Sequence, residues 1–99
     1  MLTGKQRGAL RAMANGLAPA ANIGKSGVTE SVIKGIDSYL AANELIKVSI
    51  QEGAGLDTGD TANRLAEELH AEFIQAIGRR FVLYRRARDP KKRRIEILK

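Results

Sequence analysis

The loop Gly24-Lys25-Ser26-Gly27 combines the residue types that best suit contact with an anion. Glycines allow the backbone to approach a ligand closely, and backbone amides at the start of a helix attract negative charge. Lys25 adds a mobile cation and Ser26 a hydroxyl donor. In KH domains a Gly-x-x-Gly loop clamps the nucleic-acid backbone. The same spacing occurs in plain turns, but its position before a capped helix in a basic chain favours phosphate binding.

Each glycine of this loop can be glycine for one of two reasons. Its backbone can require a positive φ, or a side chain there would fill the place of the phosphate. For Gly27, immediately before the expected helix, we favour the second reason.

Two glycine patterns resemble nucleotide-binding motifs and fail on spacing. The letters Gly-Lys-Ser at 24–26 would need a glycine at position 19 to form a P-loop, and that residue is Pro19. In the loop from Gly53 to Gly59, the third glycine follows the second by four residues, where a dinucleotide fingerprint requires three. We therefore expect no cofactor.

The composition also argues against an enzyme and against a metal site. The chain has no cysteine and one histidine, His70, which excludes thiol catalysis, zinc fingers and multi-histidine metal sites. Glu67 and Glu68 are adjacent on an expected helix, so they point about 100° apart and cannot form a facing acid–base pair. We expect neither catalysis nor a bound metal.

Positive charge is concentrated at the C-terminal end. The 99 residues include 17 Lys and Arg against 11 Asp and Glu, a net charge of +6. Residues 1–51 carry +3, residues 52–78 carry −5 and residues 79–99 carry +8. Such a segment is typical of contact with phosphate, although a solubilising tail remains an alternative. The candidates are Arg79, Arg80, Arg85, Arg86, Arg88, Lys91, Lys92, Arg93 and Arg94.

Aromatic residues are too few for a broad base-stacking platform. There are four, and two of them, Phe81 and Tyr84, have opposite parity on one expected strand. This parity predicts that at most one of the two faces a core. We therefore expect recognition of backbone and shape more than of bases.

The hydrophobic pattern predicts three helices and four strands. We expect helices at about 4–15, 30–42 and 59–71, the first two capped by Thr3 and Thr29. Strands are expected at about 19–23, 45–51, 73–77 and 81–85, and a tight turn at Gly78 joins the last two. The order α-β-α-β-α-β-β indicates an α/β fold with a four-stranded mixed sheet packed on helices.

The length indicates a single domain. We place it at residues 1–86, followed by a basic C-terminal tail at 87–99 in which residues 95–97 could add a short edge strand. No apolar run approaches the ~18 residues of a membrane span, and the N-terminus lacks the pattern of a signal peptide. We expect a cytoplasmic monomer with no membrane partner and no small-molecule substrate.

Three blocks of sequence, in order, resemble one known family. They run from Leu17 to Glu30, from Asn43 to Val48 and from Ile77 to Arg85. Together they resemble the CRM RNA-binding domain (chloroplast RNA splicing and ribosome maturation), and more closely the stand-alone bacterial YhbY-like proteins. The resemblance covers about residues 2–86.

This resemblance implies an α/β domain similar to the C-terminal domain of bacterial translation initiation factor three. It also implies RNA binding and association with precursors of the large ribosomal subunit. It maps the family's Gly-x-x-Gly loop onto Gly24 to Gly27, a basic position of the second strand onto Lys47, and a Leu-Tyr-Arg ending onto Leu83 to Arg85.

The sequence therefore predicts a small RNA-binding protein that assists ribosome assembly, with ribosomal RNA as its partner. The loop 24–27 would hold the RNA backbone, and Arg7, Arg11, Lys47 and the arginines of the final hairpin would surround it with positive charge. Two alternatives remain. One is an adaptor that docks on acidic proteins through its basic tail. The other is a double-stranded DNA binder, for which the chain lacks a recognisable recognition helix.

Overall fold

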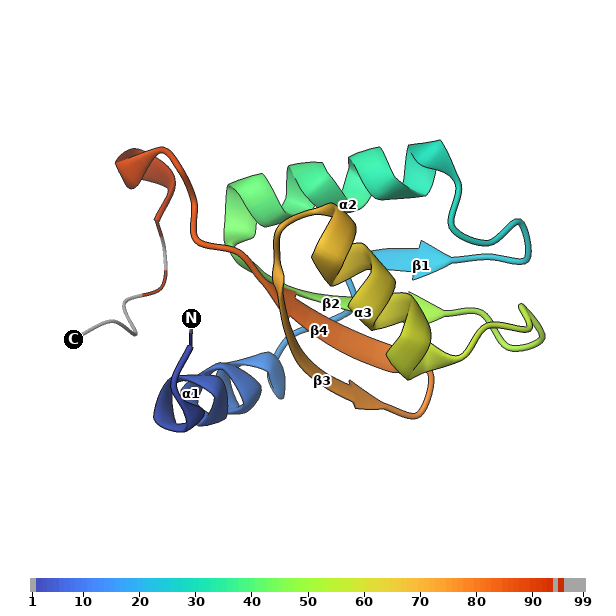
Figure 1. The fold of residues 1–99 in the computed structure, drawn as a ribbon, viewed down its shortest axis with the longest axis horizontal. Coiled ribbons are helices and arrows are strands. Elements are labelled where there is room, and N and C mark those ends of the chain that lie inside the picture. The colour runs from blue at the N-terminus through green and yellow to red at the C-terminus, as the bar shows by residue number, and fades with distance from the viewer. Residues whose placement is uncertain (1, 94, 96–99) are drawn as a thin grey trace.

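A computed structural model describes residues 2–93 and residue 95 of the chain. Its centre is a four-stranded sheet in the order β1-β2-β4-β3 (Figure 1). The strands are β1 (Ala21–Ile23), β2 (Leu45–Ile50), β3 (Glu72–Ile77) and β4 (Arg80–Tyr84). β1 runs parallel to β2, and β4 pairs antiparallel with both β2 and β3. The predicted α/β fold with a four-stranded mixed sheet is confirmed.

Three α-helices flank this sheet: α1 (Gly4–Ala14), α2 (Glu30–Asn43) and α3 (Thr58–Glu68). Thr3 forms the expected capping box with Gln6, and Thr29 Oγ1 accepts a hydrogen bond from the Val32 amide at 3.2 Å. α3 ends three residues before the predicted boundary, because His70 adopts a left-handed φ of 54° and turns the chain into β3. None of the helices in the described residues is long and apolar enough to cross a membrane.

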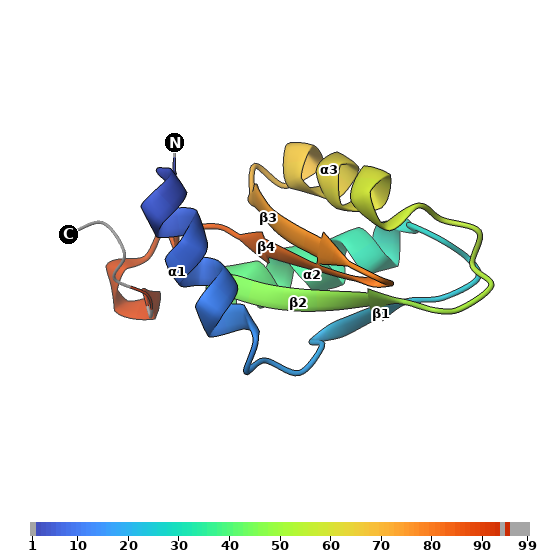
Figure 2. The same cartoon turned by 90° about the horizontal axis from the view of Figure 1, so that it is seen from below.

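Both faces of the sheet carry a hydrophobic core. Figure 2 shows that helices lie on both of these faces. α2 and α3 cover one face, where Phe81 is fully buried. α1 crosses the other face at one end, and there Tyr84 packs in the same cluster as Leu10 and Ala14. The prediction that only one of Phe81 and Tyr84 faces a core was therefore wrong, because α1 supplies a second core for the opposite face.

Candidate nucleic-acid interface

The loop from Gly24 to Gly27 joins β1 to α2 and projects beyond the end of the sheet. The Gly27 amide donates to the Gly24 carbonyl at 3.0 Å, which closes the turn. Gly27 has φ +78° with open space where a side chain would stand, so its backbone conformation alone requires glycine. This supports a required positive φ as the reason for Gly27, and not the close approach of a phosphate that we favoured from the sequence. Lys25 and Ser26 are exposed at the tip.

A second loop, residues 51–57, lies beside the first (Figure 1). The Gln51 amide donates to the Ile23 carbonyl at 2.8 Å. A side-chain carbon added at Gly24 would stand 3.2 Å from Gln51 Oε1, and one added at Gly53 would stand 3.9 Å from Lys25 Cε. The chain therefore packs these two loops against each other, and Lys25 lies over the second loop.

The turn of the β3–β4 hairpin lies at the same end of the sheet. The Arg79 carbonyl accepts from the Ile50 amide at 2.7 Å, and the Gly78 carbonyl accepts from Thr58 Oγ1 at 2.7 Å. These bonds fix the turn to the end of β2 and to the start of α3. Arg79 and Arg80 are both exposed there.

The structure divides the predicted cations into two groups. Several have no carboxylate partner within the described part of the chain. An unpaired, exposed cation can exchange its counterion for a phosphate without first breaking an internal contact. The exposed members of this group are Lys25, Arg79, Arg80, Arg11, Arg86, Arg88, Lys91 and Lys92, and Lys47 is a half-buried member.

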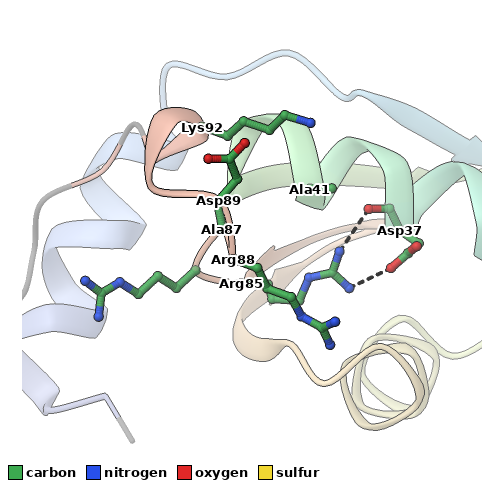
Figure 3. Close-up of a pocket in the computed structure, with 8 residues that line it drawn as sticks. Asp37, Ala41, Arg85, Ala87, Arg88, Asp89 and Lys92 are labelled. Carbon is green, nitrogen blue, oxygen red and sulfur yellow. Dashed lines mark hydrogen bonds and ion pairs between the residues drawn. The ribbon is translucent and has the colours of Figure 1, made fainter.

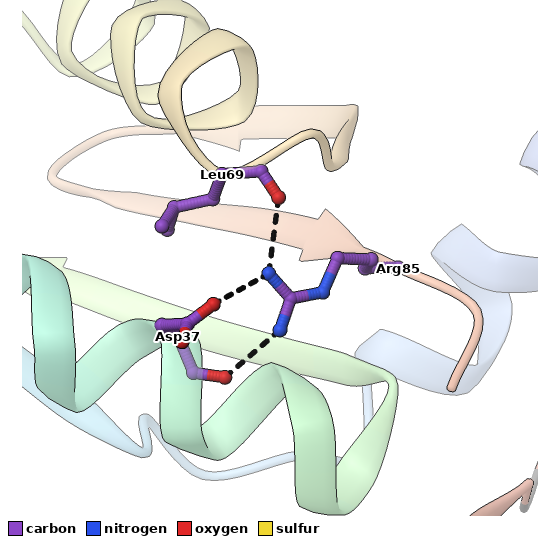
Figure 4. Close-up of polar contacts among 3 residues, drawn as sticks. All are labelled: Asp37, Leu69 and Arg85. Atoms are coloured by element: carbon purple, nitrogen blue, oxygen red, sulfur yellow. Dashed lines mark hydrogen bonds and ion pairs between the residues drawn. The ribbon is translucent and has the colours of Figure 1, made fainter. Parts of the chain in front are cut away.

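Arg85 belongs to the second group, whose guanidinium groups donate hydrogen bonds to acceptors of the protein itself. Its Nη1 donates to Asp37 Oδ1 at 2.7 Å and to the Leu69 carbonyl at 3.0 Å, and its Nη2 donates to the Asp37 carbonyl at 3.0 Å (Figure 4). The planar fork of arginine suits this arrangement of three acceptors. Arg85 therefore ties the end of β4 to α2 and to the residue after α3.

Arg7 and Arg93 are also engaged. Arg7 Nη1 donates to the Phe73 carbonyl, and Arg7 Nη2 lies 3.7 Å from Glu72 Oε2, so this side chain links α1 to β3. Arg93 Nε donates to the Ala87 carbonyl at 2.9 Å. Arg94 lies outside the described residues.

The basic segment that follows β4 borders a hollow of about 390 Å³ beside α2 (Figure 3). The segment includes a short 3₁₀ helix, η1 (Pro90–Lys92). Both signs of charge meet at the hollow, so its field is weaker than the count of arginines suggests. Its charged lining residues are Asp37, Arg85, Arg86, Arg88, Asp89 and Lys92.

Glu44 holds this segment, a role that no pattern in the sequence indicates. Glu44 is fully buried at the C-cap of α2 and has a left-handed φ of 67°. Its Oε2 accepts from the Ala87 amide at 2.8 Å, and its Oε1 accepts from the Ile95 amide at 3.0 Å. Burial, together with the nearby Glu44 carboxylate, raises the pKa of the Tyr84 phenol.

Ala87 is buried and Ile95 packs against the core on the α1 face, so both are attached to the body of the fold. Ile95 lies outside the strands, and residues 96 and 97 of the predicted edge strand lie outside the described residues. The division at residue 86 remains a prediction.

The chain is similar to one protein family and to several proteins named as RNA-binding. Residues 2–85 match the family model of the CRS1 / YhbY (CRM) domain. The Bacillus subtilis protein named probable RNA-binding protein YqeI is 41% identical over 91 residues, which is 92% of this chain and 95% of that protein. A Haemophilus influenzae protein named RNA-binding protein is 36% identical over 91% of each chain.

A solved structure shows the same fold. It is the solution structure of a Staphylococcus aureus protein described as a candidate RNA-binding protein. The TM-score is 0.79 at 38% identity, and the match covers 97% of this chain and 100% of that one. The architecture described above is therefore found in a relative whose structure was solved independently.

Proposed function

The chain belongs to the CRS1/YhbY (CRM) domain family, and from this premise we propose that it is an RNA-binding protein that acts without catalysis. The observation that carries the proposal is the exposed loop Gly24 to Gly27, which presents Lys25 and Ser26 at one end of the sheet. Unpaired cations from the neighbouring hairpin turn lie at the same end. Such an arrangement suits a phosphate backbone.

The proposed contact set is narrower than the one predicted from sequence. Gly24 to Gly27 holds the RNA backbone, with Lys47, Arg79 and Arg80 as the nearest cations on the sheet. Arg11 and the basic residues after β4 contribute a more distant field. Arg7 and Arg85 serve chiefly to hold elements together, since their guanidinium groups already have protein acceptors.

Binding to RNA is tested by replacing Lys25 and Ser26 together with Asp. The new carboxylates repel phosphate at the loop, so we expect RNA affinity to fall by about tenfold or more and the salt dependence to weaken. Lys34→Asp with Ser38→Asp is the matched control, because it makes the same change of charge on the exposed surface of α2. Unchanged RNA affinity in a folded loop variant would exclude this loop as the binding site.

The dependence on salt separates RNA binding from the adaptor alternative. Each phosphate contact with a single strand contributes a slope of about −0.7 to log K against log salt. We expect several such contacts with RNA. A slope near zero, together with tight binding to an acidic protein, would favour the adaptor.

The proposed process is ribosome assembly in the cytoplasm, with ribosomal RNA in a precursor of the large subunit as the target. The resemblance to YhbY-like proteins supports it, and the net charge of +6 on 99 residues is compatible with an RNA target. Sedimentation of a cell extract tests it. We expect the protein to migrate with a large-subunit precursor and to be released by ribonuclease or by high salt. Migration at the top of the gradient under all conditions would contradict this assignment.

A further inference from the structure

The α1 side of the sheet is only half covered. α1 packs at one end, where its Leu10 and Ala14 meet the apolar residues of β2, β3 and β4. Figure 2 shows that α1 crosses that end alone. The strand register places a row of four side chains on the remaining half, one from each strand: Asn22, Ser49, Arg80 and Ile77. Lys47 and Gln75 lie in the next row, on either side of Val82.

This open face is hollowed on both sides of Arg80. One hollow, of about 510 Å³, has Asn22, Ser49 and Ile77 among its lining residues. The other, of about 170 Å³, has Lys47 and Gln75. Arg80 and Ile77 border both, and Ile77 is 66% exposed, an unusual state for an isoleucine in a strand. The face is thus a shallow, continuous surface and not an enclosed pocket.

The chemistry of the open face suits an anion that also offers hydrogen-bonding groups. Lys47, Arg79 and Arg80 have no carboxylate partner among the described residues. Ser49 Oγ donates to Asn22 Oδ1 at 2.9 Å. This bond orients the Asn22 amide within the row that also contains Arg80. Glu52 is the acidic residue on the rim. Amide and guanidinium groups can pair with the edges of unstacked bases, and a guanidinium plane can stack on them.

The open face is continuous with the loop. Asn22 precedes Gly24 by two residues, so the row that begins with Asn22 lies directly next to the loop. A strand of RNA held at the loop can therefore continue onto this row. Four strands span about 14 Å, enough for two or three nucleotides. In an RNA duplex the Watson–Crick edges are paired and the major groove is deep and narrow, whereas a single strand exposes those edges.

Building on the proposed RNA binding, we propose that the open sheet face, formed by Asn22, Lys47, Ser49, Gln75, Ile77 and Arg80, binds a single-stranded stretch of RNA that continues from the loop 24–27. The loop 24–27 and Lys47 contact the RNA backbone. Gln75, Asn22 and Arg80 contact bases. This assigns base contact to polar side chains on the sheet, in a protein whose aromatic residues Phe81 and Tyr84 are buried in the two cores.

Two substitutions test the proposal with a short unstructured RNA oligonucleotide and an RNA duplex as probes. Arg80→Gln should weaken binding of the single strand by about tenfold, and Gln75→Ala, which changes no charge, by about threefold, with smaller effects on the duplex. Arg64→Gln is the control, since it removes one exposed cation from α3 on the far side of the sheet. Equal losses for single strand and duplex would overturn the assignment, as would wild-type affinity in both sheet variants.

A measurement on the unaltered protein keeps the test decisive if a variant fails to fold. The side-chain amide signals of Asn22 and Gln75 should shift in nuclear magnetic resonance spectra when the oligonucleotide is added. Unmoved amides with shifted signals in the loop 24–27 would overturn the sheet assignment and leave the proposed function standing. If the wild-type protein binds neither probe, the proposed function itself fails.

Discussion

The carboxylate of Glu44 accepts a hydrogen bond from the backbone amide of Ala87 at 2.8 Å, although the two residues are 43 positions apart in the chain. The second oxygen of the same carboxylate binds the Ile95 amide. One buried side chain thus holds two points of the basic segment that follows β4. Arg88, Lys91, Lys92 and Arg93 lie between these points, so their backbone positions are restrained.

Replacing Glu44 with Gln should loosen this segment. The amide side chain keeps one acceptor oxygen, so one of the two backbone amides loses its partner, which costs about 1–3 kcal/mol of stability. We expect faster cleavage by trypsin after Arg86, Arg88 and Lys91, measured by mass spectrometry. Glu67→Gln, on the exposed surface of α3, is the control. Identical cleavage in the two variants would show that Glu44 does not hold the segment.

Gly27→Ala should destabilise the protein by about 1 kcal/mol, because alanine is strained at φ +78°. Thermal unfolding measures this loss. Gly35→Ala is the matched control: this glycine lies inside α2 with open space around it, so alanine there should raise the melting temperature. An unchanged melting temperature for Gly27→Ala would contradict the turn as the reason for this glycine.

Arg85 and Arg86 are adjacent but should respond differently to substitution with Gln. Arg85→Gln removes the ion pair with Asp37 and two further hydrogen bonds, so we expect a loss of about 2 kcal/mol in unfolding free energy. Arg86→Gln should leave stability within about 0.5 kcal/mol, because Arg86 is exposed. Denaturant unfolding measures both. The reverse order of effects would contradict the structural role of Arg85.

The raised pKa of Tyr84 predicts a loss of stability in alkali. The neutral phenol is favoured in the folded state, so its contribution is fully present below the ordinary value of 10.0 and is lost as pH rises through the higher folded value. In a Tyr39→Phe variant, Tyr84 is the remaining tyrosine, and the midpoint of its phenolate absorbance titration should lie above pH 10.0. Tyr84→Phe should reduce the decline in stability over that range. A titration midpoint at or below pH 10.0 would contradict the assigned environment.

The elements of the fold could be predicted because their signals are local. Thr3 and Thr29 mark helix starts within four residues of the bonds they make, and the alternation of Ile46, Val48 and Ile50 marks a strand. The order of elements then restricts the sheet to a mixed arrangement. The position of α1 could not be read in this way, because neither strand parity nor helix periodicity states which face of a sheet a helix covers.

The candidate site could be predicted only as a set of residue types. Arg85 looks in sequence like the other arginines near the C-terminus, and its acceptor Asp37 lies 48 residues away. Glu44 likewise reads as an ordinary polar residue at the end of a helix. Contacts over such separations depend on the assembled fold, so the sequence could not divide the cations into engaged and unpaired groups.

The contact between Arg7 and the Phe73 carbonyl also bears on self-association. β3 forms one edge of the sheet, and an unprotected edge can pair with a strand of another molecule. Here the register of β3 shifts between Phe73 and Gln75, and the Arg7 guanidinium occupies a carbonyl that an incoming strand would need. β1, at the other edge, is three residues long. Both edges are therefore poor templates for strand pairing between two molecules of this protein.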